Sequence, residues 1–473
     1  MRLMPHPDRF FPADPATRDV ARRLFAEVEK LSLICPHGHT EPAWFAENGP
    51  FPDPAQLLIV PDHYVVRMLV SQGMTHAELG VPSRDGAPFE LDSRTIWRRF
   101  AGNYHLFRST PVRMWMDYTL ETLFGIQRPL CAETADQTYD QIAEVLKQDG
   151  FRPRALYERF GIEVLSTTDS CLDDLAHHKA IAASGWCGRV VPTYRPDQVT
   201  NPDTEGFLYN ITQLGALAGE DTSTWTGLLA AHRKRRVYFK SLGATATDHG
   251  HPTARTADLS GSDCQALLAR VLSANASAED KELFRAQMLT EMARMSLDDG
   301  LVMQLHAGSR RNHSAAIFSR FGPDKGFDIP GPTDYVDALR PLLNAHGHDP
   351  RLKLILFTLD ETAYGRELAP LAGAYPCLRL GPAWWFFDSP DGMMRYREMV
   401  TETAGYYNTV GFNDDTRAFP SIAARHDMAR RIDCAFLARQ VVEHRLPEGE
   451  AAEVAKDLAY TLPKRAYGYE DAA

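Results

Sequence analysis

The sequence predicts an α/β protein built as a parallel (β/α)8 barrel of the TIM type, with a mainly helical insertion between its first two strands. Eight short apolar segments recur along the 473 residues, and helix-length stretches separate most of them. No G-x-G-x-x-G follows the first segment, which disfavours the alternative of an open, dinucleotide-binding sheet. The predicted strands are 31–35, 162–167, 189–193, 237–242, 301–306, 352–358, 378–381 and 409–413.

A helix is expected before the first strand. Asp14 is placed to cap it and Pro15 suits its first turn. Val20, Leu24 and Val28 then repeat at helical spacing, which predicts one buried face. Near the other end of the chain, the tail from residue 448 to residue 473 also contains a predicted helix.

The interval between the first two strands is far longer than one crossover requires. It spans nearly 130 residues and carries helix-compatible pieces at 110–124 and 139–147. We therefore predict a helical insertion domain at 66–160, and a barrel domain made of 1–65 and 161–473. Residues 243–259, rich in Thr, His, Asp and Gly, are expected to form a long loop over one barrel face.

Composition excludes several classes of protein. The chain has 51 basic and 62 acidic residues, and its net charge of -11 disfavours a nucleic acid or an anionic membrane as partner. Its 7 cysteines contain no C-x-x-C, which argues against a disulfide framework or a cysteine zinc knuckle. No secretory signal and no membrane-spanning run is recognised. We expect a protein of the reducing cytoplasm.

Polar residues at strand ends predict a metal site, because barrel enzymes build their sites at the carboxyl ends of strands. The first strand ends in C-P-H-G-H, and two histidines at i and i+2, His37 and His39, can reach one metal ion. Alone, such a pair is more often exposed on a loop. His306 ends the fifth strand, and Asp414 and Asp415 end the eighth. Together these ends favour a mononuclear metal site.

A binuclear site is less favoured by the same pattern. It would require a bridging carboxylated lysine and a further histidine. Lys240 falls on the predicted fourth strand, but the sixth strand ends in F-T-L-D without a histidine. We therefore interpret Lys240 as structural.

A tyrosine follows the first strand in D-H-Y, at Asp62, His63 and Tyr64. A tyrosine hydroxyl has an ordinary pKa near 10, so its use as a base at neutral pH requires cations or a metal beside it. The alternative is a hydrogen-bonded core tyrosine at the start of a helix. The neighbouring metal-site pattern favours the functional interpretation.

Arginines and tryptophans complete the predicted pocket. Arg195, Arg311 and Arg417 each follow a predicted strand, and guanidinium groups at one rim can bind a carboxylate in bidentate fashion. Any one of them alone would more often form a surface ion pair. Trp384 and Trp385 can form an aromatic wall against a sugar face, or simply pack within the rim.

In order and spacing, these motifs resemble those of the uronate isomerases (glucuronate isomerases) of the amidohydrolase superfamily. The resemblance covers nearly the whole chain. It rests on H-G-H, D-H-Y, T-T-D-S with D-D-L-A-H-H-K, P-T-Y-R-P-D, T-D-H-G, Q-L-H-A-G-S-R-R-N, A-W-W-F-F-D and D-D-T-R-A-F. It implies a distorted (β/α)8 barrel with a helical inserted domain.

The resemblance also implies an activity, the reversible aldose–ketose isomerisation of hexuronates. The reactions are D-glucuronate to D-fructuronate and D-galacturonate to D-tagaturonate, and no nicotinamide or flavin is needed. It implies one divalent metal ion, usually zinc, on His37, His39 and Asp415, with Tyr64 as proton shuttle and Asp415 or His37 assisting ring opening. The substrate-binding residues it implies are His63, Arg195, His306, Arg311, Trp384, Trp385 and Arg417.

Two positions depart from the family's pattern. Family members often have an aspartate two residues before the first metal histidine, where this chain has Cys35. The strand-eight motif commonly reads T-D-S-R-S-F, where this chain reads D-D-T-R-A-F. The second acid leaves Asp414 and Asp415 as alternatives, and we choose Asp415 because it keeps the two-residue spacing to Arg417.

Two other functions fit the same residues. A metal-dependent hydrolase of the superfamily would use the His, His and Asp set to activate water against an acidic sugar lactone, ester or amide. A non-catalytic sugar-acid binding protein is a further alternative, but such a protein would not need Tyr64 beside a metal. We also expect self-association, which is common among intracellular barrel enzymes.

Overall fold

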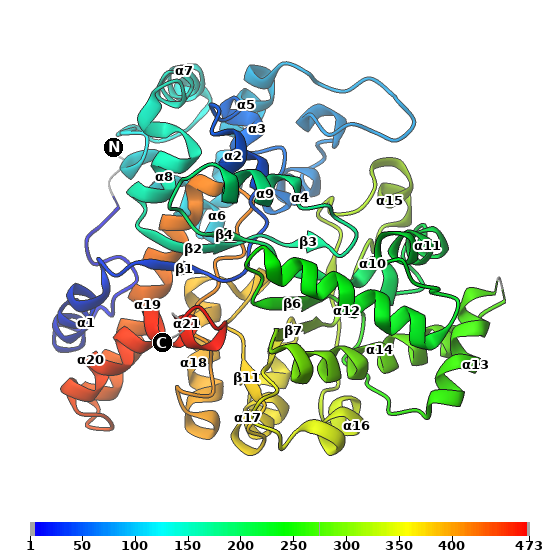
Figure 1. The fold of residues 1–473 in the computed structure, drawn as a ribbon. Helices are drawn as coiled ribbons and strands as arrows, with labels where there is room; N and C mark the ends of the chain where they lie inside the picture. The colour runs from blue at the N-terminus through cyan, green and yellow to red at the C-terminus, as the bar shows by residue number, and fades with distance from the viewer. Residues whose placement is uncertain (1–4, 274, 471–473) are drawn as a thin grey trace.

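A computed structural model describes residues 5–273 and 275–470 and contains two parallel sheets surrounded by helices (Figure 1). One sheet has the order β1-β2-β4, and the larger has the order β11-β10-β7-β6-β5-β3. A small antiparallel pair, β8-β9, is separate from both. The strands are β1 (Leu33–Cys35), β2 (Ile162–Ser166), β3 (Asp169–Ser170), β4 (Val190–Val191), β5 (Tyr194–Arg195), β6 (Ala246–His249), β7 (Val302–Ala307), β8 (Ser309–Arg310), β9 (Ile329–Pro330), β10 (Leu354–Thr358) and β11 (Leu378–Leu380).

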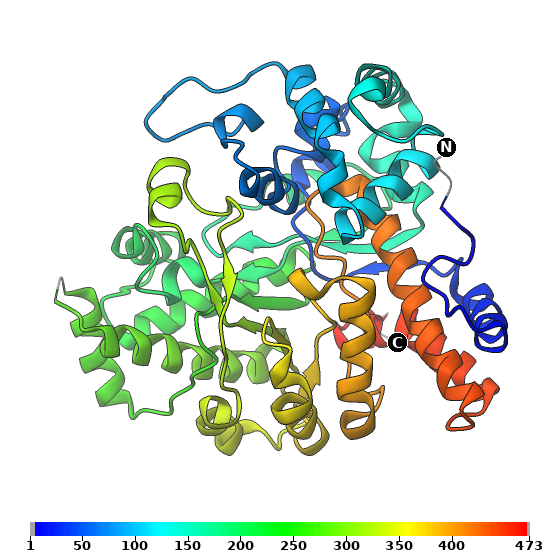
Figure 2. The same cartoon turned by 180° about the vertical axis from the view of Figure 1, so that it is seen from behind.

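Helices cover the outside of both sheets (Figures 1 and 2). No helix in the described part of the chain is both long and apolar enough to cross a membrane. The α-helices are α1 (Pro15–Val28), α2 (Pro42–Glu47), α3 (Pro54–Leu58), α4 (His63–Ser71), α5 (Ser93–Gly102), α6 (Pro111–Thr122), α7 (Ala135–Leu146), α8 (Pro153–Arg159), α9 (Ala176–Ala183), α10 (Asp197–Thr200), α11 (Phe207–Ala218), α12 (Trp225–Ser241), α13 (Gly261–Leu272), α14 (Ala278–Asp299), α15 (Ala315–Phe321), α16 (Val336–His346), α17 (Ala369–Ala374), α18 (Pro390–Ala404), α19 (Ile422–Val442), α20 (Glu448–Lys456) and α21 (Leu462–Ala466).

The interval between β1 and β2 is helical, as its pattern indicates. All its described regular elements are helices, and α5, α7 and α8 gather on one side of the molecule in Figure 1. Trp97 and Phe100 of α5 are fully buried and belong to the same apolar cluster as Leu305 of β7 and Leu356 of β10. The interval therefore packs onto the sheets through a continuous core, and the domain division at 66 and 160 stays a prediction.

The first predicted helix is confirmed as α1. Asp14 caps it by accepting a hydrogen bond from the Thr17 N–H at 2.9 Å, and Val20, Leu24 and Val28 are buried. These side chains pack in one apolar cluster with residues of α19 and α20, which lie beside α1 in Figure 1. The helical pieces predicted at 110–124 and 139–147 correspond to α6 and α7. In the tail, a wide turn at 457–461 joins α20 to α21.

The predicted fourth strand is wrong. Residues 237–242 form the end of α12 and its cap, and the strand that takes this place is β6, inside the stretch predicted to be a long loop. Short apolar runs do not distinguish a strand from part of a helix. Here Val237 is 64% exposed while Phe239 is fully buried, a one-sided pattern that suits a helix. Lys240 therefore lies on a helix, where its side chain donates to the Asp299 carbonyl.

The predicted eighth strand is reduced to a single bridge. Residues 409–413 pair with β11 only through Leu380 and Thr409, and Gly411 then takes a φ of 79° that an extended strand does not allow. Among the described residues no ladder joins this segment to β1, and the two sheets do not close into a barrel. The chain changes sheets from β2 to β3, returns from β3 to β4, and changes again from β4 to β5.

We predict that Gly411→Ala lowers the free energy of unfolding by roughly 1–3 kcal/mol, the usual cost of a strained backbone position. A Cβ at Gly411 would lie 2.6 Å from the Leu458 carbonyl oxygen and from Pro463 Cδ, in addition to the positive φ. Urea unfolding followed by circular dichroism measures the change. Gly449→Ala is the matched control, because a Cβ there meets nothing within 4 Å. Equal midpoints for the two variants would contradict the prediction.

Candidate active site

One cavity of about 280 Å³ collects the predicted site residues. It opens where β1, β5 and β7 end, and after β11, so its walls come from the carboxyl ends of parallel strands. Every residue that the sequence predicted for catalysis, metal binding or substrate binding lines this cavity: His37, His39, His63, Tyr64, Arg195, His306, Arg311, Trp384, Trp385, Asp415 and Arg417.

His37, His39 and Asp415 form a compact group within this cavity. Asp415 Oδ1 lies 3.2 Å from His39 Nε2 and 3.6 Å from His37 Nε2. This oxygen is buried and accepts no hydrogen bond within the described part of the molecule. A buried carboxylate oxygen that faces two imidazole nitrogens fits a divalent cation such as zinc.

The backbone of Asp415 is held in an unusual conformation. Its φ is 43°, a left-handed value that is uncommon outside glycine. Its N–H donates to the His37 carbonyl at 3.2 Å, and Trp384 Nε1 donates to its Oδ2 at 2.6 Å. Burial alone would raise the pKa of Asp415, but the imidazoles of His39 and His37 beside its carboxylate hold the pKa well below its usual range. The carboxylate is therefore ionised.

The two adjacent acids, Asp414 and Asp415, point in different directions. Asp414 turns away from the cavity, and its Oδ2 lies 3.2 Å from His426 Nε2. Asp415 is the one that shares a point with His37 and His39. The segment therefore presents its two carboxylates to opposite sides.

Tyr64 lies at the start of α4, where Asp62 fixes the first turn by accepting the Tyr64 N–H at 2.8 Å. The His63 ring stacks on the Tyr64 ring with centroids 4.4 Å apart. Burial, and then the Asp415 charge, raises the pKa of Tyr64 well above its usual value. Formation of a phenolate therefore needs positive charge. The guanidinium carbons of Arg67 and Arg425 both lie 6.0 Å from the Tyr64 ring centroid.

The predicted arginines each have carboxylate neighbours. Arg195 Nε donates to Asp197 at 2.8 Å, and Arg311 Nη1 donates to Asp328 at 3.1 Å. Arg417 Nη2 lies 3.8 Å from Asp324, beyond hydrogen-bond distance. The rim thus carries several guanidinium groups that can bind an anion.

Asp248 lies beneath the cavity and is fully buried. Its carboxylate lies 2.7 Å from His306 Nε2, 3.4 Å from Arg195 Nη1 and 3.9 Å from His37 Nδ1. Asp248 carries no predicted role, because the sequence of β6 was interpreted as part of a loop. Recognition of β6 would have put this acid at a strand end, among the site signals.

The sequence analysis also missed several polar residues that line the cavity. Arg425 comes from α19, where nothing in R-H-D distinguishes it from other arginines of a helix. Asp324 and Asp328 are the other charged residues outside the quoted motifs, whereas Asp62, Arg67 and Asp197 lie in or beside D-H-Y and P-T-Y-R-P-D but carry no predicted role. Asp324 and Asp328 belong to a loop without a motif, so no local signal could have identified them.

Comparisons with known proteins agree along the whole chain. A family described as glucuronate isomerase matches residues 13–467. A uronate isomerase of Rhizobium meliloti (strain 1021) is 65% identical over 99% of this chain and 100% of its own length. A second, of Mesorhizobium japonicum, is 62% identical over the same shares.

Solved structures give the same result. The crystal structure of glucuronate isomerase from Caulobacter crescentus matches with a TM-score of 0.98 at 55% identity, covering 100% of this chain and 98% of that one. The uronate isomerase of Thermotoga maritima matches with a TM-score of 0.91 at 28% identity, covering 98% and 99%. The α/β fold with parallel sheets is therefore that of these proteins.

We predict that His249 makes stability depend on pH. Burial lowers the pKa of this fully buried imidazole to about 3, and its Nε2 lies 2.9 Å from Thr247 Oγ1. In the unfolded chain a histidine takes up a proton below about pH 6.5. The native state binds fewer protons between these values, so stability falls as pH falls, by up to about 1.4 kcal/mol per pH unit.

The measurement is urea unfolding between pH 7.5 and pH 5. His249→Gln should show a shallower loss of stability on acidification than the parent protein. His177→Gln, at an exposed position of α9, is the control and should keep the parent slope. A parent slope retained in His249→Gln would show that this imidazole does not contribute.

Proposed function

The chain belongs to the glucuronate isomerase family, and from this premise we propose that it interconverts D-glucuronate with D-fructuronate, and D-galacturonate with D-tagaturonate. The enzyme class is aldose–ketose isomerase. The hydrolase alternative is not favoured, because the family and the highly identical relatives are uronate isomerases along their full length.

One observation carries the proposal for the site. His37, His39 and Asp415 meet in the same cavity as Tyr64 and the arginines of the rim. This arrangement suits a substrate that has a carboxylate at one end and an exchangeable carbon-bound proton at the other. We assign the substrate carboxylate to Arg311 and Arg417, because their shortest ion pairs, at 3.1 and 3.8 Å, are longer than the 2.8 Å pair of Arg195 with Asp197.

The proposed reaction moves one proton between neighbouring carbons. Asp415 or His37 assists ring opening by moving a hydroxyl proton, and His63, Arg195, His306, Trp384 and Trp385 orient the open chain. Tyr64 takes the proton from C2 and returns one to C1, while the hydroxyl proton of C2 moves to the oxygen of C1. The intermediate is an enediol, and no electrons leave the substrate, so no nicotinamide or flavin is required.

Positive charge around Tyr64 has to offset its burial. Arg425 is held between the Asp388 carboxylate, at 2.8 Å, and the Asp414 carbonyl, at 3.0 Å, so its position near the Tyr64 ring is fixed before substrate binds. Fixed cations near a developing anion need no reorganisation during the reaction. We therefore include Arg425 among the residues that support proton transfer.

His37, His39 and Asp415 would hold one divalent metal ion, which we propose to be zinc because two imidazoles and a carboxylate are ligands it accepts. When bound, such an ion supplies positive charge that stabilises negative charge developing on substrate oxygen. His306 and Asp248, in contact at 2.7 Å, lie beside His37 and fix the surroundings of the site.

Three wider assignments are also proposals. We infer that the two sheets are parts of one distorted (β/α)8 barrel. The backbone contacts between residues 37–39 and 415–416 lie where β1 and the eighth strand of such a barrel would pair. We also infer a cytoplasmic enzyme that self-associates. The net charge of -11 supports the expectation that it binds neither nucleic acid nor an anionic membrane.

The function is tested by incubation with D-glucuronate and with D-galacturonate in deuterium oxide. We expect ketose formation, deuterium at C1 of the product, and loss of turnover after chelation. Tyr64→Phe should lower kcat by about 100- to 10,000-fold, the usual contribution of general acid–base catalysis. Near-normal turnover in Tyr64→Phe would remove Tyr64 from the mechanism, and lactone cleavage without isomerisation would support the hydrolase.

Trp384→Phe should weaken zinc binding about 10- to 100-fold, because hydrogen bonds to ligating carboxylates commonly have effects of this size. The variant removes the donor to Asp415 Oδ2 and keeps an aromatic ring. Competition with a fluorescent chelator measures the affinity. Trp186→Phe is the control, since it removes a similar donor at 3.0 Å from Glu158, outside the cavity. Equal affinities in the two variants would contradict the role given to Trp384.

A further inference from the structure

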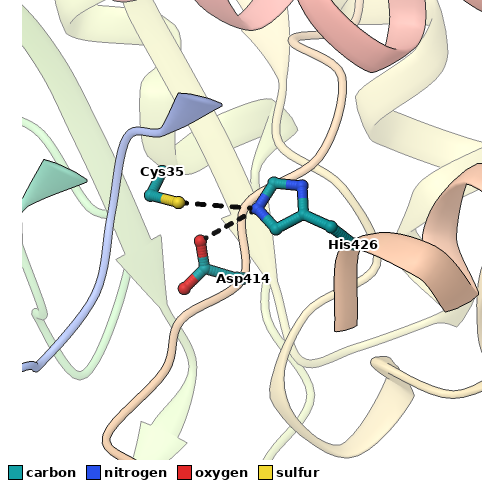
Figure 3. A group of neighbouring side chains, drawn as sticks. All are labelled: Cys35, Asp414 and His426. Carbon is teal, nitrogen blue, oxygen red and sulfur yellow. Dashed lines mark hydrogen bonds and ion pairs between the residues drawn. The ribbon is translucent and has the colours of Figure 1, made fainter. Parts of the chain in front are cut away.

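A second buried group of metal-ligand side chains lies behind the candidate active site. It consists of Cys35 at the end of β1, Asp414 after the 409–413 segment, and His426 of α19, which point toward one another in Figure 3. Their exposed fractions are 2%, 1% and 4%. None of the three lines the substrate cavity.

The distances within this group match a tetrahedral zinc site. Cys35 Sγ lies 3.6 Å from His426 Nε2, and His426 Nε2 lies 3.2 Å from Asp414 Oδ2. With usual zinc bond lengths of about 2.0 Å to nitrogen and oxygen and about 2.3 Å to sulfur, tetrahedral ligands lie about 3.6 Å (N to S) and about 3.3 Å (N to O) apart. At the candidate active site, the nitrogen-to-oxygen distances from His37 and His39 to Asp415 are 3.6 and 3.2 Å.

Hydrogen bonding alone accounts less well for this geometry. A charge-assisted hydrogen bond from an imidazole to a carboxylate is usually about 2.7–2.9 Å long, shorter than the distance found here. A single nitrogen, His426 Nε2, also faces both Cys35 Sγ and Asp414 Oδ2, as Figure 3 shows. In a purely hydrogen-bonded cluster, the imidazole N–H and the Cys35 thiol would both donate to Asp414, whereas a shared cation would bind all three atoms.

The chemistry of the group selects the kind of ion. A thiolate, an imidazole and a carboxylate are all zinc ligands, and sulfur disfavours magnesium and calcium. On binding, the Cys35 thiol releases its proton to solvent and forms a metal–sulfur bond. The thiolate and the Asp414 carboxylate then balance the charge of the divalent ion, so the buried unit is neutral.

An approach to this group exists that does not pass through the active site. A cavity of about 440 Å³ is lined by His426, Leu33 and Arg430, and shares no lining residue with the substrate cavity. Of the three side chains, His426 is the one that lines this cavity. Arg430, the nearby cation, is held by the carbonyls of Glu29, Leu31 and Ser32.

We propose that Cys35, Asp414 and His426 bind a second, structural zinc ion. The ion joins β1, the segment that leads to Asp415, and α19, at the place where no described strand ladder connects the first two. It fixes the backbone immediately next to Asp415 and two residues before His37. Its role is to position the active-site ligands, and it does not contact the substrate.

Cobalt substitution tests this proposal, because only a site with sulfur gives a thiolate-to-cobalt charge-transfer band in the near ultraviolet. The candidate active site has no sulfur ligand. We expect the band when metal-free protein is loaded with an excess of Co²⁺. It should disappear in Cys35→Ser and persist in Cys171→Ser, a variant of another buried cysteine. Absence of the band in the parent protein, or its persistence in Cys35→Ser, overturns the proposal.

Metal content gives a second, independent measurement. Protein refolded with Zn²⁺ and analysed by native mass spectrometry should contain two ions per chain, and His426→Gln should contain one. His39→Asn should also contain one ion and should keep the cobalt–thiolate band. A single ion in the parent protein, lost in His39→Asn, would mean that Cys35, Asp414 and His426 form a hydrogen-bonded cluster only. Because the band does not depend on turnover, a failure of the proposed isomerase activity would leave this test unaffected.

Discussion

The candidate site depends on two backbone hydrogen bonds that join the residues after β1 to residues 415 and 416. The Asp415 N–H donates to the His37 carbonyl, and the His39 N–H donates to the Thr416 carbonyl at 2.9 Å. These bonds bring the H-x-H pair and the carboxylate together in a region that no described ladder connects. A left-handed aspartate costs about 1–3 kcal/mol, so Asp415 keeps its conformation only because the contacts around it permit no other.

Electrostatic balance is the second constraint on the cavity. Both carboxylates and guanidinium groups line it. The fully buried Asp248 carboxylate lies 2.7 Å from His306 and 3.4 Å from Arg195. Arg195 is held by a short bond to Asp197, while Arg417 is beyond hydrogen-bond distance from Asp324. A substrate carboxylate therefore displaces the least existing interaction at Arg417. In the proposed binding mode, Asp248 keeps its contacts with His306 and Arg195, and Arg417 binds the substrate carboxylate in place of Asp324.

The sequence indicated which residues line the cavity better than it indicated the strands. His37, Tyr64, His306 and Asp415 could be recognised because each follows an apolar run and stands in a distinctive motif. The fourth strand was misplaced because 237–242 is short and apolar, and the polar T-D-H of β6 did not look like a strand. Arg425 and Asp324 reach the cavity from a helix and a loop. Only tertiary packing brings them there, so local patterns carry no signal for them.

The sequence predicted a closed barrel, whereas the described strands do not close, and the reason is related. The 409–413 segment contains Gly411 at positive φ, so an apolar run that alternates like a strand cannot continue its ladder. Six of the eight predicted strands correspond to described strands, but pairing depends on backbone conformation at single residues. The chain instead connects β1 and residues 414–416 through contacts beyond the ends of the strands.

The two departures from the family's pattern concern one place in the structure. From the family resemblance, an aspartate is expected at the position of Cys35 and a threonine at the position of Asp414. Separately, each looks like an isolated substitution. In space, the Cys35 sulfur and the Asp414 carboxylate face the same nitrogen of His426. The thiol is the feature that makes the group suitable for zinc.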